Sequence, residues 1–213
     1  MTQCWRISLA TNWTKVGADL DGDSSSPGGF GYSVSSSCDG SRVAIGAPIV
    51  SFFGFGISYV RVFEYNNSSS WVQLGTDIEG ESNEQFLQRR LAPSGVPDST
   101  GSSVSLSSDG SRVAVGAPKS GGGGTDAGHV RVFEYNSFSS SWVQLGADID
   151  GEAAGDESGG AVSLSVNGSH VAVGAPRNGG GGSDAGHVRV FEYNSFSSSW
   201  VQLGADIDGE AAG

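Results

Sequence analysis

The sequence predicts an all-β fold, a β-propeller-type repeat array whose units are four-stranded antiparallel sheets, or blades, forming a partial or open propeller. The octapeptide SRVAVGAP at 111–118 recurs as SRVAIGAP at 41–48 and as SHVAVGAP at 169–176. Each copy follows an Asp-Gly or Asn-Gly pair, the strongest short-range signal for a β-hairpin. Each also precedes two further strand-like runs, one ending in FEYN and one beginning with WVQLG. Short strands repeated in this way are typical of propellers, solenoids or arrays.

The spacing of the tryptophans gives the length of the repeat. Those that open the WVQLG-type run stand at Trp13, Trp71, Trp142 and Trp200, at intervals of 58, 71 and 58 residues. The longer middle interval indicates an insertion in the second unit. Residues 126–155 are identical to residues 184–213, which indicates an internal duplication.

The second unit shows the four expected strands. They are predicted at 101–107, 112–117, 129–136 and 142–149, with a turn at 108–111 between the first two. The first two strands carry small residues and the last two carry the aromatic ones. This gradient fits a blade that is narrow at the propeller axis and wide at the rim.

Counting these units along the chain predicts about three and a half blades. Residues 1–20 would supply the last two strands of a partial blade and residues 21–80 the first full blade. Residues 81–149 would form the second blade with an insertion at 81–100, and residues 150–213 the third blade and the start of the next linker. The end blades would then lack neighbours, and exposed faces and strand edges promote association. We therefore expect self-association, or further blades of a longer parent chain, as partners of this array.

Composition excludes several classes of function. The net charge of −12 disfavours nucleic acid, which selects basic surfaces. No apolar run is long enough to insert into a membrane, and the chain start lacks a signal-peptide pattern. The two cysteines, Cys4 and Cys38, are too few for a disulfide framework and are expected to be unpaired.

The first full unit carries a family pattern. Phe30-Gly31, followed by Val34 and then by Gly46-Ala47-Pro48, resembles the FG-GAP repeat, the blade of the integrin α-chain propeller. The GAP end occurs three times, but Thr100-Gly101 and Ser158-Gly159 stand at the FG positions of the later units. The resemblance implies a propeller on an extracellular or cell-surface adhesion or recognition protein. The family's calcium loop is not carried over, because the connection here is only SCDGS, SSDGS or SVNGS.

Alternating acids follow the fourth strand of each unit and are the candidate cation ligands. Carboxylates in a glycine-containing turn suit calcium, which takes six to eight oxygen ligands. The spacing lacks the downstream acid of an EF-hand, so the pattern favours a solvated interblade loop, with weak calcium binding as the alternative and no other cofactor. The candidate ligands are Asp19, Asp21, Asp23, Asp148, Asp150 and Glu152.

Two loops carry the candidate partner-binding residues. The aromatic cluster Phe52, Phe53 and Phe55 would mark a contact surface or pack against a missing blade. Arg89 and Arg90 lie in the insertion, and loops on rigid scaffolds often carry function. His129 and His187 open equivalent strands and are expected at the blade rim, not as ligands.

The function predicted from the sequence is a non-enzymatic propeller module for binding or adhesion to a protein or glycan. Nearly identical blades multiply one surface, whereas catalysis needs different groups converging in one pocket, and no catalytic residue is predicted. The alternatives are an enzyme or a sugar-binding protein that uses the propeller axis, and a purely structural repeat array.

Overall fold

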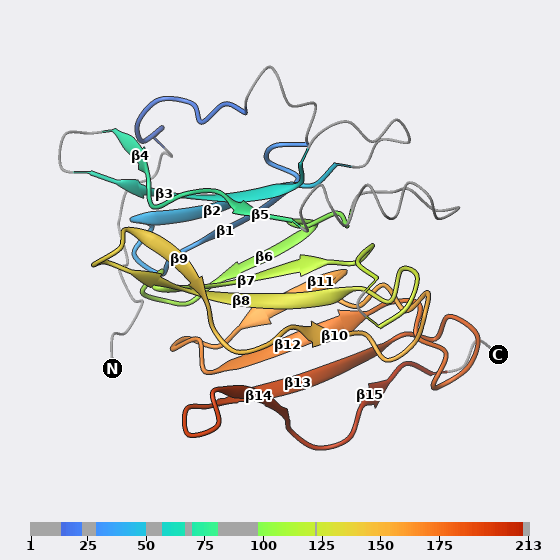
Figure 1. Cartoon of the computed structure of the whole chain (residues 1–213). Helices are drawn as coiled ribbons and strands as arrows, with labels where there is room; N and C mark the ends of the chain where they lie inside the picture. Colours follow the sequence, from blue (N-terminus) through green and yellow to red (C-terminus); the bar gives the residue numbers. More distant parts are fainter. Residues whose placement is uncertain are drawn as a thin grey trace.

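The regular structure of the chain is entirely β in the computed structural model, which describes residues 14–22, 29–49, 57–66, 70–80, 98–121 and 123–210. Within these residues, fifteen strands form three antiparallel sheets that follow one another along the chain (Figure 1). No helix that could cross a membrane is found in the part of the chain that is described.

The three sheets have the same set of strands. Sheet 1 consists of β1 (Ser33–Ser36), β2 (Arg42–Ala47), β3 (Tyr59–Tyr65), β4 (Trp71–Gln73) and β5 (Ile78–Glu79). Sheet 2 consists of β6 (Ser103–Leu106), β7 (Arg112–Ala117), β8 (His129–Asn136), β9 (Ser141–Gln144) and β10 (Ile149–Asp150). Sheet 3 consists of β11 (Ala161–Leu164), β12 (His170–Ala175), β13 (His187–Asn194), β14 (Ser199–Gln202) and β15 (Ile207–Asp208).

The order of strands is a meander, as the repeat predicts, with one difference in the last strand. Strands β7 and β8 have the predicted bounds, and β6 lies within its predicted range. The predicted fourth strand at 142–149 is wrong as a continuous element, because β9 and β10 pair separately with β8. Gly146 lies between them at a φ of +78° and interrupts the extended backbone.

The first strands of the sheets lie side by side, which is the arrangement of blades around a propeller axis (Figure 1). Serine side chains join them. The Ser33 hydroxyl donates to the Gly101 carbonyl at 2.7 Å, and the Ser103 hydroxyl donates to that of Gly159 at 2.8 Å. Small side chains on these strands therefore serve close approach of one sheet to the next.

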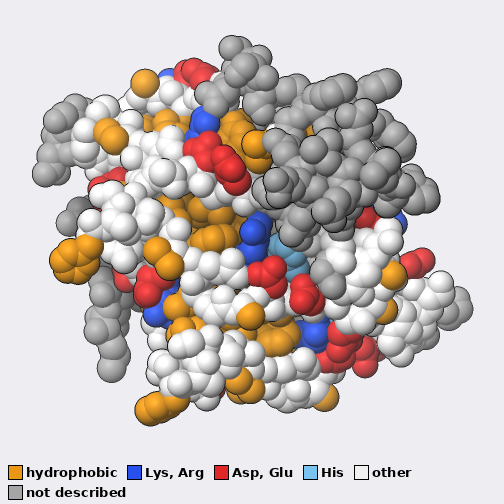
Figure 2. Space-filling view, in the orientation of Figure 1, with side chains coloured by type: hydrophobic (Ala, Val, Ile, Leu, Met, Phe, Trp, Pro, Cys, Tyr) orange, Lys and Arg blue, Asp and Glu red, His pale blue; other side chains and the backbone are white. Residues whose placement is uncertain are grey.

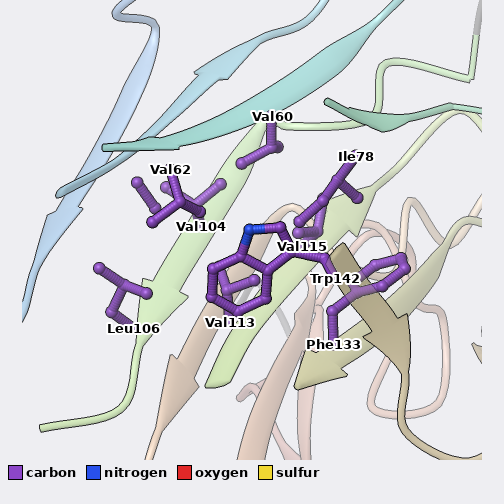
Figure 3. Close-up of a cluster of buried hydrophobic side chains, with 10 residues drawn as sticks. Val60, Val62, Ile78, Val104, Leu106, Val113, Val115, Phe133 and Trp142 are labelled. Carbon is purple, nitrogen blue, oxygen red and sulfur yellow. The ribbon is translucent and has the colours of Figure 1, made fainter. Parts of the chain in front are cut away.

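The hydrophobic core lies between neighbouring sheets, and hydrophobic side chains appear as bands between them in Figure 2. The cluster between sheets 1 and 2 is drawn in Figure 3 and includes Val60, Val62, Ile78, Val104, Leu106, Val113, Val115, Phe133 and Trp142. A second cluster joins sheets 2 and 3 and includes Val130, Val132, Ile149, Val171, Val173 and Phe191. Both faces of sheet 2 are thus covered, as expected for an internal blade.

The cysteine prediction fails at Cys38, which is disulfide-bonded. The predicted partial blade falls largely outside the described residues, and residues 14–22 form no strand. They nevertheless lie beside sheet 1, where the Trp71 indole donates to the Val16 carbonyl at 3.0 Å. The Trp142 indole makes the matching bond to Leu74 at 2.8 Å.

The hairpin turns of sheets 1 and 2 are each closed by one aspartate. Hydrogen bonds from the Ser41 amide and from the Ser37 and Ser41 hydroxyls lower the pKa of Asp39. Burial opposes ionisation of Asp109, but the matching bonds from Ser107 and Ser111 outweigh it, so its pKa is also lowered. A lowered carboxyl pKa stabilises the fold above the unfolded value of about 4, and this stabilisation is lost as pH falls through the folded pKa.

We therefore expect the double variant Asp39→Asn/Asp109→Asn to be less stable than the wild type at neutral pH, because it lacks the ionised carboxylates, and to lose less stability as the pH falls below about 4. Asn167 provides the internal precedent, because its side-chain oxygen accepts from the Ser169 amide and hydroxyl at 3.1 and 2.8 Å. Urea unfolding at several pH values measures the difference. Equal acid sensitivity of the two proteins would contradict this account of the turns.

Candidate binding face and metal cluster

Sheet 3 exposes a face that is buried in the other two sheets. Val188 of β13 is 37% exposed and Ile207 of β15 is 62% exposed. Their equivalents in sheet 2, Val130 and Ile149, are 0% and 4% exposed. The face is uncovered because no described sheet follows sheet 3.

A groove of about 500 Å³ lies on this face, lined in part by Gly174, Ala185, Val188 and Ile207. In sheet 2 the matching position receives a loop of sheet 3: the Ser158 amide donates to the Ala127 carbonyl at 2.9 Å. No backbone hydrogen bond from the described residues reaches the matching carbonyl of Ala185. The groove thus leaves exposed a face and a backbone carbonyl whose equivalents in sheet 2 contact the next sheet.

The opposite end of the array presents the complementary surface. Val34 of β1 is 65% exposed, whereas Val104 of β6 is 9% exposed and packs in the core between sheets 1 and 2. The described array therefore ends in an uncovered face at sheet 3 and, at sheet 1, in an inner strand that is exposed at Val34 while residues 14–22 lie beside Trp71 of β4.

The two strand-opening histidines lie among carboxylates, and both are buried: His129 is 1% exposed and His187 is 5% exposed. The acids after the fourth strand fold back over the start of β8 and β13, which buries these histidines, and their expected place at the blade rim stays a prediction. On the side of the molecule that Figure 2 shows, a histidine side chain has acidic and basic side chains beside it. The signal that could have found them is the constant spacing of His129 to Asp148 and His187 to Asp206.

The structure distributes the predicted metal ligands over separate places. Asp148 and Asp150 form a group with His129, whereas Glu152 joins His187 and Asp206 in the next blade. The three acids that follow β9 thus do not surround one ion. Two of them lie near His129 and the third lies near His187.

The N-terminal acids are placed differently. Asp19 forms an ion pair with Lys15 at 2.6 Å, and Asp21 is exposed. Asp23 lies outside the described residues, so its role stays a prediction. No ligand group for an ion is found around Asp19 or Asp21 in residues 14–22.

The predicted partner-binding residues Phe52, Phe53, Phe55, Arg89 and Arg90 all lie outside the described residues. Their role stays a prediction.

The arginine of the third strand has a different hydrogen-bond partner in sheet 1 than in sheets 2 and 3. Arg61 binds both oxygens of Asp77, each at 2.9 Å. Arg131 instead donates to the Glu79 carbonyl at 3.2 Å, and Arg189 donates to the Asp150 carbonyl at 2.7 Å. In sheets 2 and 3 the matching aspartates are therefore left facing the histidines.

Comparison with known proteins finds similar structures but no matching family. No protein-family model matches the chain, and no curated protein matches it. A structure provisionally named 6-phosphogluconolactonase, from Bacteroides uniformis, is similar at 13% identity and a TM-score of 0.49, over 83% of this chain and 40% of that one. Sqt1 of Saccharomyces cerevisiae is similar at 12% identity and a TM-score of 0.47, over 85% and 36%. A provisionally named TolB of Agrobacterium tumefaciens is similar at 16% identity and a TM-score of 0.40, over 81% and 45%, so the chain spans less than half the length of each of the three.

Proposed function

We propose that the chain is a non-enzymatic protein-interaction module of the β-propeller type, whose uncovered end face binds a blade of the same repeat supplied by a second copy. One observation carries the proposal: Val188 and Ile207 are exposed, while the matching residues of sheets 1 and 2 are buried against the next sheet. The same face of sheet 1 packs against sheet 2, and that of sheet 2 packs against sheet 3. The exposed face of sheet 3 is therefore suited to packing against another blade. The exposed Val34 at the other end supplies the surface that would enter it.

The serines of the axis support a role without catalysis. The hydroxyls of Ser33 and Ser103 donate to backbone carbonyls of the following sheets, and the Ser35 hydroxyl accepts from the Leu106 amide at 2.9 Å. A nucleophile needs an adjacent base and access to substrate, whereas these groups serve the packing of blades.

The FG-GAP resemblance supports recognition at a cell surface or in an extracellular setting. Phe30 packs against Tyr59 and Phe63 of β3, with ring centroids 6.4 Å apart in both pairs, and the Gly46-Ala47-Pro48 motif ends β2 in a buried position. The disulfide at Cys38 also suits an oxidising compartment. On these grounds the proposal includes adhesion to a protein or glycan.

The test is the oligomeric state of the full chain by sedimentation velocity across a wide concentration range. We expect reversible association in the wild type and a monomer in Ile207→Lys, because a charge cannot be buried against a blade without a partner. Val143→Lys is the matched control: Val143 is 48% exposed on the outer strand β9, away from the end face. A wild type that stays monomeric, or equal association of all three proteins, would refute the proposal.

A further inference from the structure

Three residues from two neighbouring sheets converge at the start of β13. Glu152 follows β10 of sheet 2, whereas His187 and Asp206 belong to sheet 3. The His187 Nδ1 atom lies 3.8 Å from Glu152 Oε2 and 3.7 Å from Asp206 Oδ2. One nitrogen and two carboxylate oxygens thus surround a common point between the blades.

We propose that Glu152, His187 and Asp206 bind a divalent first-row transition metal ion, zinc above all. An imidazole nitrogen with two carboxylates is a ligand set for zinc, whereas calcium takes oxygen ligands alone. A tetrahedral ion with bonds of about 2.1 Å sets its ligand atoms about 3.4 Å apart. The separations from His187 Nδ1 are 3.7 and 3.8 Å, and the two carboxylate oxygens lie within 4.8 Å of each other, so the three atoms must move closer together around the ion.

The histidine itself points to a ligand. The His187 side chain is 1% exposed, and its Nε2 atom is buried without a hydrogen-bond partner among the described residues. Its Nδ1 atom faces the two carboxylates at distances beyond a hydrogen bond. Burying an imidazole without hydrogen bonds is costly, and a metal ion on Nδ1, the nitrogen that faces the carboxylates, would offset part of that cost, while Nε2 stays without a partner among the described residues.

Neighbouring groups already orient the acids. The Gln202 side chain donates to Asp206 Oδ1 at 2.6 Å, which leaves Oδ2 directed at His187. Arg189 lies 3.6 Å from Glu152 Oε1, while Oε2 faces the histidine. Such outer contacts orient ligands and tune metal affinity. With two carboxylates and one arginine, the cluster carries a net negative charge that attracts a cation.

Sheet 1 shows the same position without the metal-binding groups. Tyr59 replaces the histidine, and Arg61 occupies both oxygens of Asp77. Sheet 2 resembles sheet 3, with His129 Nδ1 3.9 Å from Asp148 Oδ2. The site is therefore specific to the blades that carry histidine.

The experiment titrates zinc into the untagged full chain, against a chromophoric chelator, for the wild type and three variants. We expect His187→Gln to remove one zinc equivalent and Glu152→Gln to weaken that site by at least about tenfold. His170→Gln is the matched control, because His170 lies 3.7 Å from Glu192 on the surface without a third ligand. Its zinc binding should equal that of the wild type.

Cobalt substitution gives an independent readout, since a nitrogen-and-oxygen site should give visible absorption bands. In His187→Gln these bands should lose the contribution of this site, and any bands that remain would come from the group around His129. Glu152 is 44% exposed at its side chain, so Glu152→Gln keeps the test valid if the histidine variant fails to fold. Zinc should also raise the melting temperature of the wild type by joining sheets 2 and 3. A wild type without zinc binding, or an equal loss of zinc in the His170 control, overturns the proposal.

Discussion

Replacing Gly116 with alanine is expected to lower the free energy of unfolding by about 3 kcal/mol. Gly116 lies in β7, in close contact with the loop that leads into sheet 3. A Cβ atom there would lie 2.1 Å from the Gly159 carbonyl oxygen and 2.3 Å from the Ser103 hydroxyl oxygen. The carbonyl belongs to the backbone, so the sheets must move apart to admit one methyl group. The loss is a large part of the 5–15 kcal/mol that stabilises a typical domain.

The repeat supplies both a replicate and a control for this variant. Gly46→Ala should be as harmful, because its Cβ atom would lie 2.1 Å from the Gly101 carbonyl oxygen. Gly174 occupies the same position in sheet 3, but its nearest neighbour would be the Ala161 Cβ atom at 3.4 Å, an ordinary contact. Gly174→Ala is therefore expected within about 0.5 kcal/mol of the wild type. Urea unfolding compares the three, and equal stability of Gly116→Ala and Gly174→Ala would refute the packing of sheet 3 on sheet 2.

Local patterns were sufficient to predict the strands. Strands β7 and β8 have the expected bounds because alternating side chains and an Asp-Gly turn determine a hairpin over a few residues. The break at Gly146 was not predictable in the same way. The run WVQLGADID is continuous in sequence, and its single glycine adopts a left-handed backbone both at Gly146 and at Gly204, where no described sheet follows. The next blade adds a steric limit at Gly146, where a Cβ atom would lie 3.0 Å from the Trp200 ring.

Burial of the candidate sites depends on neighbours, and for that reason it was not predictable. Residues 126–155 and 184–213 are identical, yet Val130 is 0% exposed and Val188 is 37% exposed. No feature within either segment distinguishes them, because the difference lies in whether another sheet follows. The His187 cluster depends on a neighbour too, since Glu152 comes from sheet 2. The sequence therefore predicts the ligand residues but not which of them meet.

Charge pairing across strands was predictable for the glutamate of the third strand but not for its arginine. Arg131 and Glu134 recur in every unit, which predicts charge pairs across strands. The structure confirms this for Glu134, which pairs with Arg112, its neighbour on β7, at 2.9 Å. Arg131 lies three residues before Glu134 and therefore points to the opposite face of β8. There it donates a hydrogen bond to the Glu79 carbonyl of sheet 1.

The tryptophan at the start of β9 is expected to be the most costly side chain to truncate. Trp142 is 9% exposed and belongs to the core between sheets 1 and 2. Its ring packs against Tyr135 at a centroid distance of 5.3 Å, and its indole nitrogen donates to the Leu74 carbonyl at 2.8 Å. Trp142→Ala should therefore cost about 3–5 kcal/mol in the free energy of unfolding.

Comparing Trp142 with Trp200 of the duplicated segment shows how much of this loss in the free energy of unfolding depends on a neighbouring sheet. Trp200 has the same local sequence and makes the matching bond to Leu145 at 2.8 Å, but it is only half-buried. Trp200→Ala is expected to cost less than Trp142→Ala, since less apolar surface is lost from the core. Phe138→Ala, at a fully exposed loop residue, is the control and should leave stability unchanged. Denaturant unfolding followed by circular dichroism ranks the three, and a loss below about 1 kcal/mol for Trp142→Ala would contradict the core between sheets 1 and 2, because a buried Trp cannot be removed so cheaply.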